Sequence, residues 1–143
     1  MIVGVLAAAL AASPVPPAPG AGWHLAWADE FDAPRIDPAK WSLADDCWGG
    51  GNAERQCYTR REANARVEDG QLLITARSEA HTGPAFPVDQ RRGANREKEA
   101  SKPFTSARLS TRGKAAWRHG IIEVRARLPQ GQGLWPAIWM LPE

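Results

Sequence analysis

The sequence predicts an all-β fold, an antiparallel β-sandwich, on three observations. From Trp23 onward, apolar and polar residues alternate with a period of two rather than 3.6. The 143 residues include 13 Gly and 12 Pro, which favours many turns over long helices. No segment has a convincing helical pattern, since residues 94–100 are polar all round and are better interpreted as a loop. The length predicts one domain.

The N-terminal segment predicts export. Residues 2–12 are almost wholly apolar, and such a run is too short to span a bilayer. A Pro-rich stretch follows and ends at Gly20, so we interpret residues 1–20 as a signal peptide and linker. Residues 21–143 then form the domain, in a secreted or periplasmic protein. The n-region has no basic side chain, and the alternative is an Ala-Pro tail.

Four segments are predicted as strands. Residues 71–77 alternate, and Asp69-Gly70 before them is a strong hairpin signal. Residues 104–111 and 120–128 also alternate, which is typical of half-buried strands. Residues 134–141 are apolar on both faces, as in a strand buried on both sides, and Pro136 predicts a bend there.

Two cysteines enclose a glycine-rich loop. Cys47 and Cys57 enclose nine residues, among them Gly49, Gly50 and Gly51. In an exported protein this spacing predicts a disulfide, and two free thiols are the alternative. A zinc site is not expected, because neither a CxxC pair nor a histidine cluster accompanies them.

The same loop carries a row of polar side chains. If residues 52–58 are extended, Asn52, Glu54, Gln56 and Tyr58 share one face. Amide, carboxylate and phenol groups suit a ligand with many hydroxyls, because each donates to or accepts from them. The alternative is a polar loop folded on itself.

Three further residues are candidates for a ligand site. Arg108 is interpreted either as a surface residue or as a guanidinium lining a cleft. Trp135 and Trp139 fall on one face of the last apolar run, roughly 13 Å apart if it is a strand. They are either platforms for sugar rings or core residues. Four other tryptophans are interpreted as structural residues rather than ligand contacts: Trp23, Trp27, Trp41 and Trp117.

The charge distribution argues against a nucleic-acid partner. Residues 1–70 carry six basic and ten acidic side chains, and residues 71–143 carry twelve basic and six acidic ones. The basic half contains no run of five like charges, which is typical of a solvated surface.

Five blocks, in order, resemble the N-terminal half of glycoside hydrolase family 16, in particular the laminarinase-type endo-β-1,3-glucanases of bacteria. They are WADEFD at 27–32, GGGNAERQCYT at 49–59, NARVEDGQLLITAR at 64–77, FTSARLSTRGKAAWRHGIIEVRARLP at 104–129 and GQGLWPAIWMLP at 131–142. The resemblance implies a jelly-roll, concanavalin A-like sandwich that is incomplete in these residues. It also implies retaining hydrolysis of β-glucans by two glutamates about 5–5.5 Å apart.

The family's catalytic motif, E-[IL]-D-x-x-E, is missing from the 143 residues. We therefore expect no catalytic residue in this chain, and expect it to be the N-terminal portion of a hydrolase whose glutamates lie beyond Glu143. These residues alone are expected to be inactive.

The resemblance implies binding roles for individual residues. Asn52 and Glu54 match the loop that lines the cleft, Arg108 matches a cleft arginine, and Trp135 and Trp139 match cleft tryptophans. Glu30 and Gly70 match positions whose carbonyls hold a structural calcium, here an incomplete site. No other cofactor is expected. The expected partner is a β-glucan polysaccharide, with no nucleic acid or membrane partner, and the protein is expected to be a monomer.

Two other functions are considered. One is a non-catalytic β-glucan-binding module on the same sandwich, and the sequence following residue 143 would distinguish it from a hydrolase. The other is an unrelated small secreted β-protein with one disulfide, which the five ordered blocks disfavour.

Overall fold

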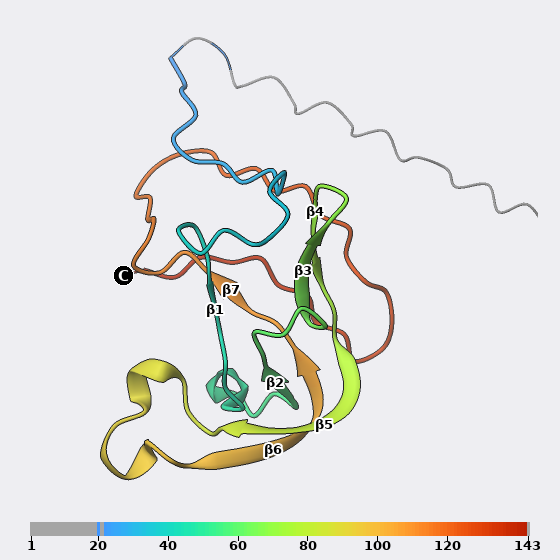
Figure 1. The fold of residues 1–143 in the computed structure, drawn as a ribbon. Helices are drawn as coiled ribbons and strands as arrows, with labels where there is room; N and C mark the ends of the chain where they lie inside the picture. The colour runs from blue at the N-terminus through green and yellow to red at the C-terminus, as the bar shows by residue number, and fades with distance from the viewer. Residues whose placement is uncertain (1–19, 21, 143) are drawn as a thin grey trace, which may run out of the picture.

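The computed structural model describes Gly20 and residues 22–142, and these residues form strands, turns and loops (Figure 1). The predicted signal peptide lies outside the described residues, except for Gly20. Short 3-10 turns occur in three connections, and the described part contains no α-helix, so the mostly-β prediction is confirmed. The strands are β1 (Ser42–Leu43), β2 (Gln56–Tyr58), β3 (Ala65–Glu68), β4 (Gln71–Ile74), β5 (Arg77–Pro84), β6 (Glu99–Ser106) and β7 (Leu109–Ser110). The 3-10 turns are η1 (Gly49–Gly51), η2 (Val88–Gln90) and η3 (Gly93–Asn95).

The predicted hairpin is present as β3 and β4. The strands are antiparallel, and Glu68 lies opposite Gln71 at the turn. Asp69 and Gly70 both have positive φ, 51° and 69°. Asp-Gly favours this two-residue turn because both residues tolerate the left-handed region. The hairpin prediction is therefore confirmed, with β4 ending at Ile74.

The largest sheet has the strand order β2-β6-β5 (Figure 1). β5 and β6 run antiparallel, with an irregularity in register between Ser78 and His81. β2 pairs with β6 in parallel, with Cys57 opposite Thr105. We expected antiparallel pairing throughout, and this expectation is wrong for β2 and β6. The two strands are far apart in sequence, so no tight hairpin turn sets their relative direction.

β1 and β7 form a third, two-stranded sheet. The described residues thus form three small sheets, and the stacked sandwich stays a prediction. The predicted strand 104–111 is divided between β6 and β7. β6 also begins at Glu99, so the loop expected over residues 94–100 ends two residues early.

The strands expected at residues 120–128 and 134–141 are wrong. Residues 111–142 contain turns and loop but no strand, and Figure 1 shows them as an open orange-to-red path. A strand needs a neighbour to pair its N–H and C=O groups, and no described segment pairs with this region. Large apolar side chains in this run consequently stay exposed: Ile121, Ile122, Val124, Leu128, Leu134, Trp135, Ile138, Trp139, Met140 and Leu141.

A buried polar network joins the hairpin to the largest sheet. Asn64 is fully buried and accepts a hydrogen bond from the Thr59 hydroxyl at 2.6 Å. Its amide donates to Thr105 Oγ1 at 2.9 Å, and that hydroxyl donates to Glu79 Oε1 at 2.6 Å. Arg61 donates to the same Glu79 oxygen. The Thr105 hydroxyl, followed by Arg61, lowers the pKa of the Glu79 carboxyl to about 2.

Three of the tryptophans assigned to structure pack together. The ring centroids of Trp27 and Trp41 are 5.4 Å apart, and those of Trp27 and Trp117 are 5.3 Å apart, both edge-on. Phe31 stacks on Trp41 at 6.3 Å. Trp23 lies outside this cluster and is 54% exposed, so its structural assignment gains no support.

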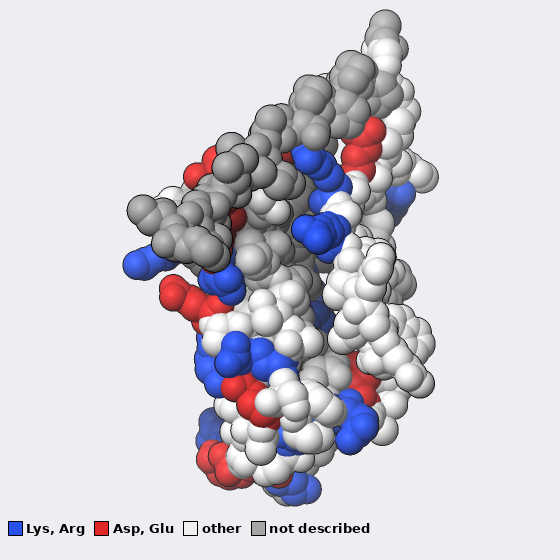
Figure 2. Space-filling model, turned by 90° about the vertical axis from the view of Figure 1, so that its right-hand side faces the viewer, with Lys and Arg blue, Asp and Glu red and all other residues white. Residues whose placement is uncertain are grey.

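Among the described residues, we find no helical segment that could span a bilayer. On the face drawn in Figure 2, basic and acidic side chains lie interspersed rather than gathered by sign.

Candidate functional site

The candidate site is built on the loop closed by the two cysteines. Cys47 and Cys57 form a disulfide with their Cα atoms 4.0 Å apart, so the predicted pairing is confirmed. Both cysteines are buried. The backbone N–H of Cys47 donates to the Pro84 carbonyl at the end of β5, while Cys57 lies in β2. The disulfide therefore fixes both ends of the loop against the largest sheet.

The three glycines shape the turn within this loop. Gly49, Gly50 and Gly51 all have positive φ, where side chains are disfavoured. A Cβ on Gly49 would clash with Lys102 Nζ and would lie 2.7 Å from the Glu54 carbonyl oxygen. Lys102 reaches from β6 and donates to that carbonyl. Only glycine at position 49 leaves room for this contact.

Asn52 and Glu54 project from this turn toward the same point. A Cβ on Gly50 would meet Glu54 Oε1 at 2.9 Å and Asn52 Oδ1 at 3.1 Å. The extended conformation expected for residues 52–58 is wrong at its start, because β2 begins only at Gln56 and Ala53 has positive φ. The turn nevertheless brings the two predicted residues together.

Glu54, Gln56 and Tyr58 form a continuous hydrogen-bonded row. Gln56 Nε2 donates to Glu54 Oε2 at 2.7 Å and to the Tyr58 hydroxyl at 3.0 Å. The Tyr58 hydroxyl in turn donates to Glu54 Oε2 at 2.9 Å. Burial, followed by the hydrogen bond to Glu54, raises the pKa of the Tyr58 phenol. The shared face predicted for these side chains is present.

Arg108 completes the row. It follows β6, and its guanidinium carbon lies 5.0 Å from the centroid of the Tyr58 ring. Arg108, Tyr58, Gln56 and Glu54 are all half-buried, so each is partly open to solvent. We call these four residues, together with Asn52, the polar strip.

The polar strip has the chemistry for a neutral ligand with many hydroxyls. It combines a carboxylate acceptor, amides that donate and accept, and a guanidinium that only donates. Both charged groups act on Tyr58: Glu54 raises the pKa of its phenol, and Arg108 lowers it. A carboxylate that accepts, on Glu54, and a guanidinium that donates, on Arg108, suit ligand hydroxyls, because each hydroxyl can both donate and accept.

Trp135 and Trp139 are not brought to the polar strip by any described contact. They lie in the strandless segment and are 90% and 61% exposed, so the spacing expected for a strand does not apply. Lys102 is the residue that sequence reasoning missed. Its contact with Glu54 spans 48 positions, and no local pattern distinguishes it from other surface lysines.

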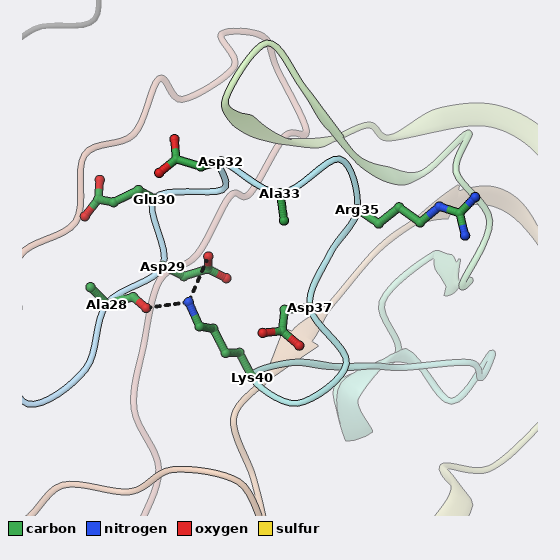
Figure 3. Close-up of a pocket in the computed structure, with 8 residues that line it drawn as sticks. All are labelled: Ala28, Asp29, Glu30, Asp32, Ala33, Arg35, Asp37 and Lys40. Carbon is green, nitrogen blue, oxygen red and sulfur yellow. Dashed lines mark hydrogen bonds and ion pairs between the residues drawn. The ribbon is translucent and has the colours of Figure 1, made fainter.

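The predicted calcium residues lie apart from this strip. Glu30 lines a pocket with Asp29, Asp32 and Asp37, and Figure 3 shows Lys40 within it bonded to Asp29 and to the Ala28 carbonyl. Gly70 is at the hairpin turn and does not line this pocket. Within the described residues, no three His, Cys, Asp or Glu side chains are placed to hold a metal ion. Calcium therefore stays a prediction.

Proteins with similar sequences share the region that contains the polar strip. The chain is 48% identical to the β-glucanase of Rhodothermus marinus over 123 residues, 85% of this chain and 37% of that protein. It is 47% identical to a glucan endo-1,3-β-glucosidase of Cryptopygus antarcticus over 122 residues, 85% of this chain and 39% of that protein. The chain is homologous to the laminarinases of glycoside hydrolase family 16. No family model matches it.

A solved structure supports the family 16 relationship. A mutant of SCLam, described as a non-specific endo-β-1,3(4)-glucanase from family GH16, superimposes with a TM-score of 0.50 and 31% identity. The match covers 68% of this chain and 35% of that one. The chain therefore spans less than two fifths of the length of the glucanases it matches.

The chain is also similar to a protein named for binding rather than for hydrolysis. The chain is 33% identical over 138 residues to a β-1,3-glucan-binding protein of Penaeus monodon, covering 80% of this chain and 37% of that protein.

Proposed function

We propose that this chain supplies the glucan-binding side of a secreted β-1,3-glucanase, and that the polar strip contacts the polysaccharide. The observation that carries the proposal is the packed row of Glu54, Gln56 and Tyr58 under Arg108, in a chain homologous to laminarinases. Within the row, Glu54 Oε1 takes part in no described hydrogen bond and is available to accept from a sugar hydroxyl.

We further propose that the whole protein is a retaining hydrolase with a jelly-roll domain. Its two catalytic glutamates would lie beyond Glu143, one as the nucleophile and the other as the general acid and base. Residues 1–20 would direct export. A structural calcium would use the carbonyls of Glu30 and Gly70 and would need further ligands, because calcium takes six or more oxygens.

Binding is tested with the full 143-residue chain passed over immobilised laminari-oligosaccharides. Wild-type chain should bind, and Glu54→Gln should weaken binding because it replaces the charged acceptor. Thr82→Ala is the matched control, since Thr82 is exposed on β5 and bonds only Ser101 among its described contacts. An equal affinity of Glu54→Gln and wild type would exclude the polar strip as the contact surface.

Hydrolysis is tested with a chimera. Residues 23–142 are joined to the remaining part of the Rhodothermus marinus β-glucanase, and reducing-sugar release from laminarin is measured. The chimera should cleave laminarin and the 143-residue chain should not. Release of sugar by the unextended chain would contradict the placement of the catalytic glutamates.

A glucan-binding module without catalysis is the second candidate, favoured by the similarity to the Penaeus monodon protein. The polar strip would serve binding equally in both cases. The residues that follow Glu143 in the whole protein distinguish the two: E-x-D-x-x-E indicates a hydrolase, and its loss indicates a binding module.

A further inference from the structure

Tyr58 is held rigidly by its backbone. As the last residue of β2, it lies opposite Ser106 of β6. On its other side its N–H donates to the Asp46 carbonyl at 2.8 Å, and its carbonyl accepts from the Asp46 N–H at 3.1 Å. The preceding residue is Cys57, which is tied to Cys47 by the disulfide. The Tyr58 side chain is therefore attached to a backbone that is hydrogen-bonded on both sides.

The Tyr58 hydroxyl and the Gln56 amide fix the orientation of the Glu54 carboxylate. Tyr58 and Gln56 both donate to Glu54 Oε2, at 2.9 and 2.7 Å. Oε1 then points to the glycine turn, beside Asn52 Oδ1. Two donors on one oxygen fix the rotation of the carboxylate, because rotation would break both hydrogen bonds.

The ring of Tyr58 supports the second charged group. The Arg108 guanidinium lies 5.0 Å from the ring centroid, within the range of a cation–π contact. Such a contact orients the guanidinium over the ring, which leaves its N–H groups at the rim. One side chain thus contacts both Glu54 through its hydroxyl and Arg108 through its ring.

We propose that Tyr58 is the positioning residue of the polar strip, fixing Glu54 and Arg108 so that both contact the same segment of a β-linked glucan. This inference rests on the proposed function and adds a residue that acts through its two neighbours. Preorganised groups bind more tightly because less side-chain freedom is lost on binding. Removing only the Tyr58 hydroxyl should therefore reduce affinity while leaving the fold intact.

The chain offers a specific probe of these contacts, since Tyr58 is its only tyrosine. Tyrosinate absorbance during an alkaline titration reports Tyr58 alone, with circular dichroism recording that the fold persists. Glu54 raises the pKa of Tyr58 and Arg108 lowers it. Glu54→Gln should therefore shift the pKa downward toward the ordinary value, and Arg108→Gln should shift it upward. If the pKa of Tyr58 is unchanged in both variants, the inference is wrong.

Affinity for laminari-oligosaccharides gives the second measurement. Tyr58→Phe should weaken binding by the full chain about tenfold, equivalent to about 1.4 kcal/mol, while the chain still folds and melts cooperatively. Thr82→Ala should bind as wild type does. If wild type binds and Tyr58→Phe binds equally well, the positioning role is wrong while the proposed function stands. If wild type does not bind, the proposed function fails, and the titration still tests the contacts.

Discussion

At the scale of single residues, Gly49 is the position where a side chain would do most damage to the polar strip. It has φ of 73°, and a Cβ there would meet both Lys102 Nζ and the Glu54 backbone. Gly49→Ala should cost about 1–2 kcal/mol for the left-handed backbone, plus the cost of displacing Glu54. Thermal unfolding and glucan affinity measure the two effects.

Gly113→Ala is the matched control for this substitution. Gly113 has φ of 71°, and a Cβ there meets nothing within 4 Å. It should lose stability through the backbone alone and keep full affinity. If both variants lose the same stability and the same affinity, the contact of the added Cβ at position 49 with Lys102 and Glu54 has no effect.

The Glu79 carboxyl should make the stability of the folded chain depend on pH in the acid range. Its pKa in the folded protein is about 2, below the ordinary value of 4.5, so the folded state favours the ionised carboxylate. This contribution is fully present above about pH 4.5 and is lost as the pH falls toward 2. Melting temperatures of wild type should fall through this range. Glu79→Gln should melt lower at neutral pH and depend less on pH below 4.5.

Glu68→Gln serves as the control for Glu79. Glu68 is an exposed carboxylate paired with Arg66 on the hairpin. Exposed ion pairs contribute little, so this variant should keep the wild-type pH profile. A Glu79→Gln profile that coincides with that of Glu68→Gln would contradict the role assigned to the buried network.

Residue pairs close in sequence were predictable, and distant ones were not. The Cys47–Cys57 disulfide and the shared face of Glu54 and Tyr58 follow from spacing over ten residues or fewer. The bonds from Lys102 to Glu54 and from Asn64 to Thr105 span 48 and 41 positions. Neither leaves a periodic pattern in the sequence, because each depends on where β6 is placed.

At the scale of elements, the disulfide-closed loop should depend on its covalent bond. Replacing both Cys47 and Cys57 with Ser should lower the free energy of unfolding by about 2–3 kcal/mol, measured in urea. Wild-type chain under strong reductant should lose a similar amount, while the double variant should not respond to reductant. An unchanged urea midpoint in the double variant would show that the loop holds its shape without the bond.

Element prediction succeeded where the determinants are local. The β3–β4 hairpin depends on Asp69-Gly70 and on alternation within ten residues. Residues 120–128 alternate equally well, yet they form no strand because no described segment offers them a ladder partner. Alternation indicates which face would be buried, whereas pairing decides whether the strand forms.

At the scale of the whole molecule, the exposed apolar side chains of residues 121–141 should drive self-association. Apolar area contributes about 25 cal/mol per Å² when removed from water, so contact between copies is favourable. Sedimentation of the 143-residue chain should show mass rising with concentration. The chimera, whose added residues are expected to cover this segment, should remain monomeric. A chain that stays monomeric at all concentrations would contradict this expectation.

The central claim is that β-glucan lies on the polar strip. A crystal structure of the chain with a bound laminari-oligosaccharide, prepared below the onset of self-association, tests it most directly. The account predicts sugar hydroxyls within hydrogen-bond distance of Glu54 Oε1 and the Arg108 guanidinium, with Tyr58 unmoved. An oligosaccharide bound elsewhere, with these groups facing only water, would contradict it.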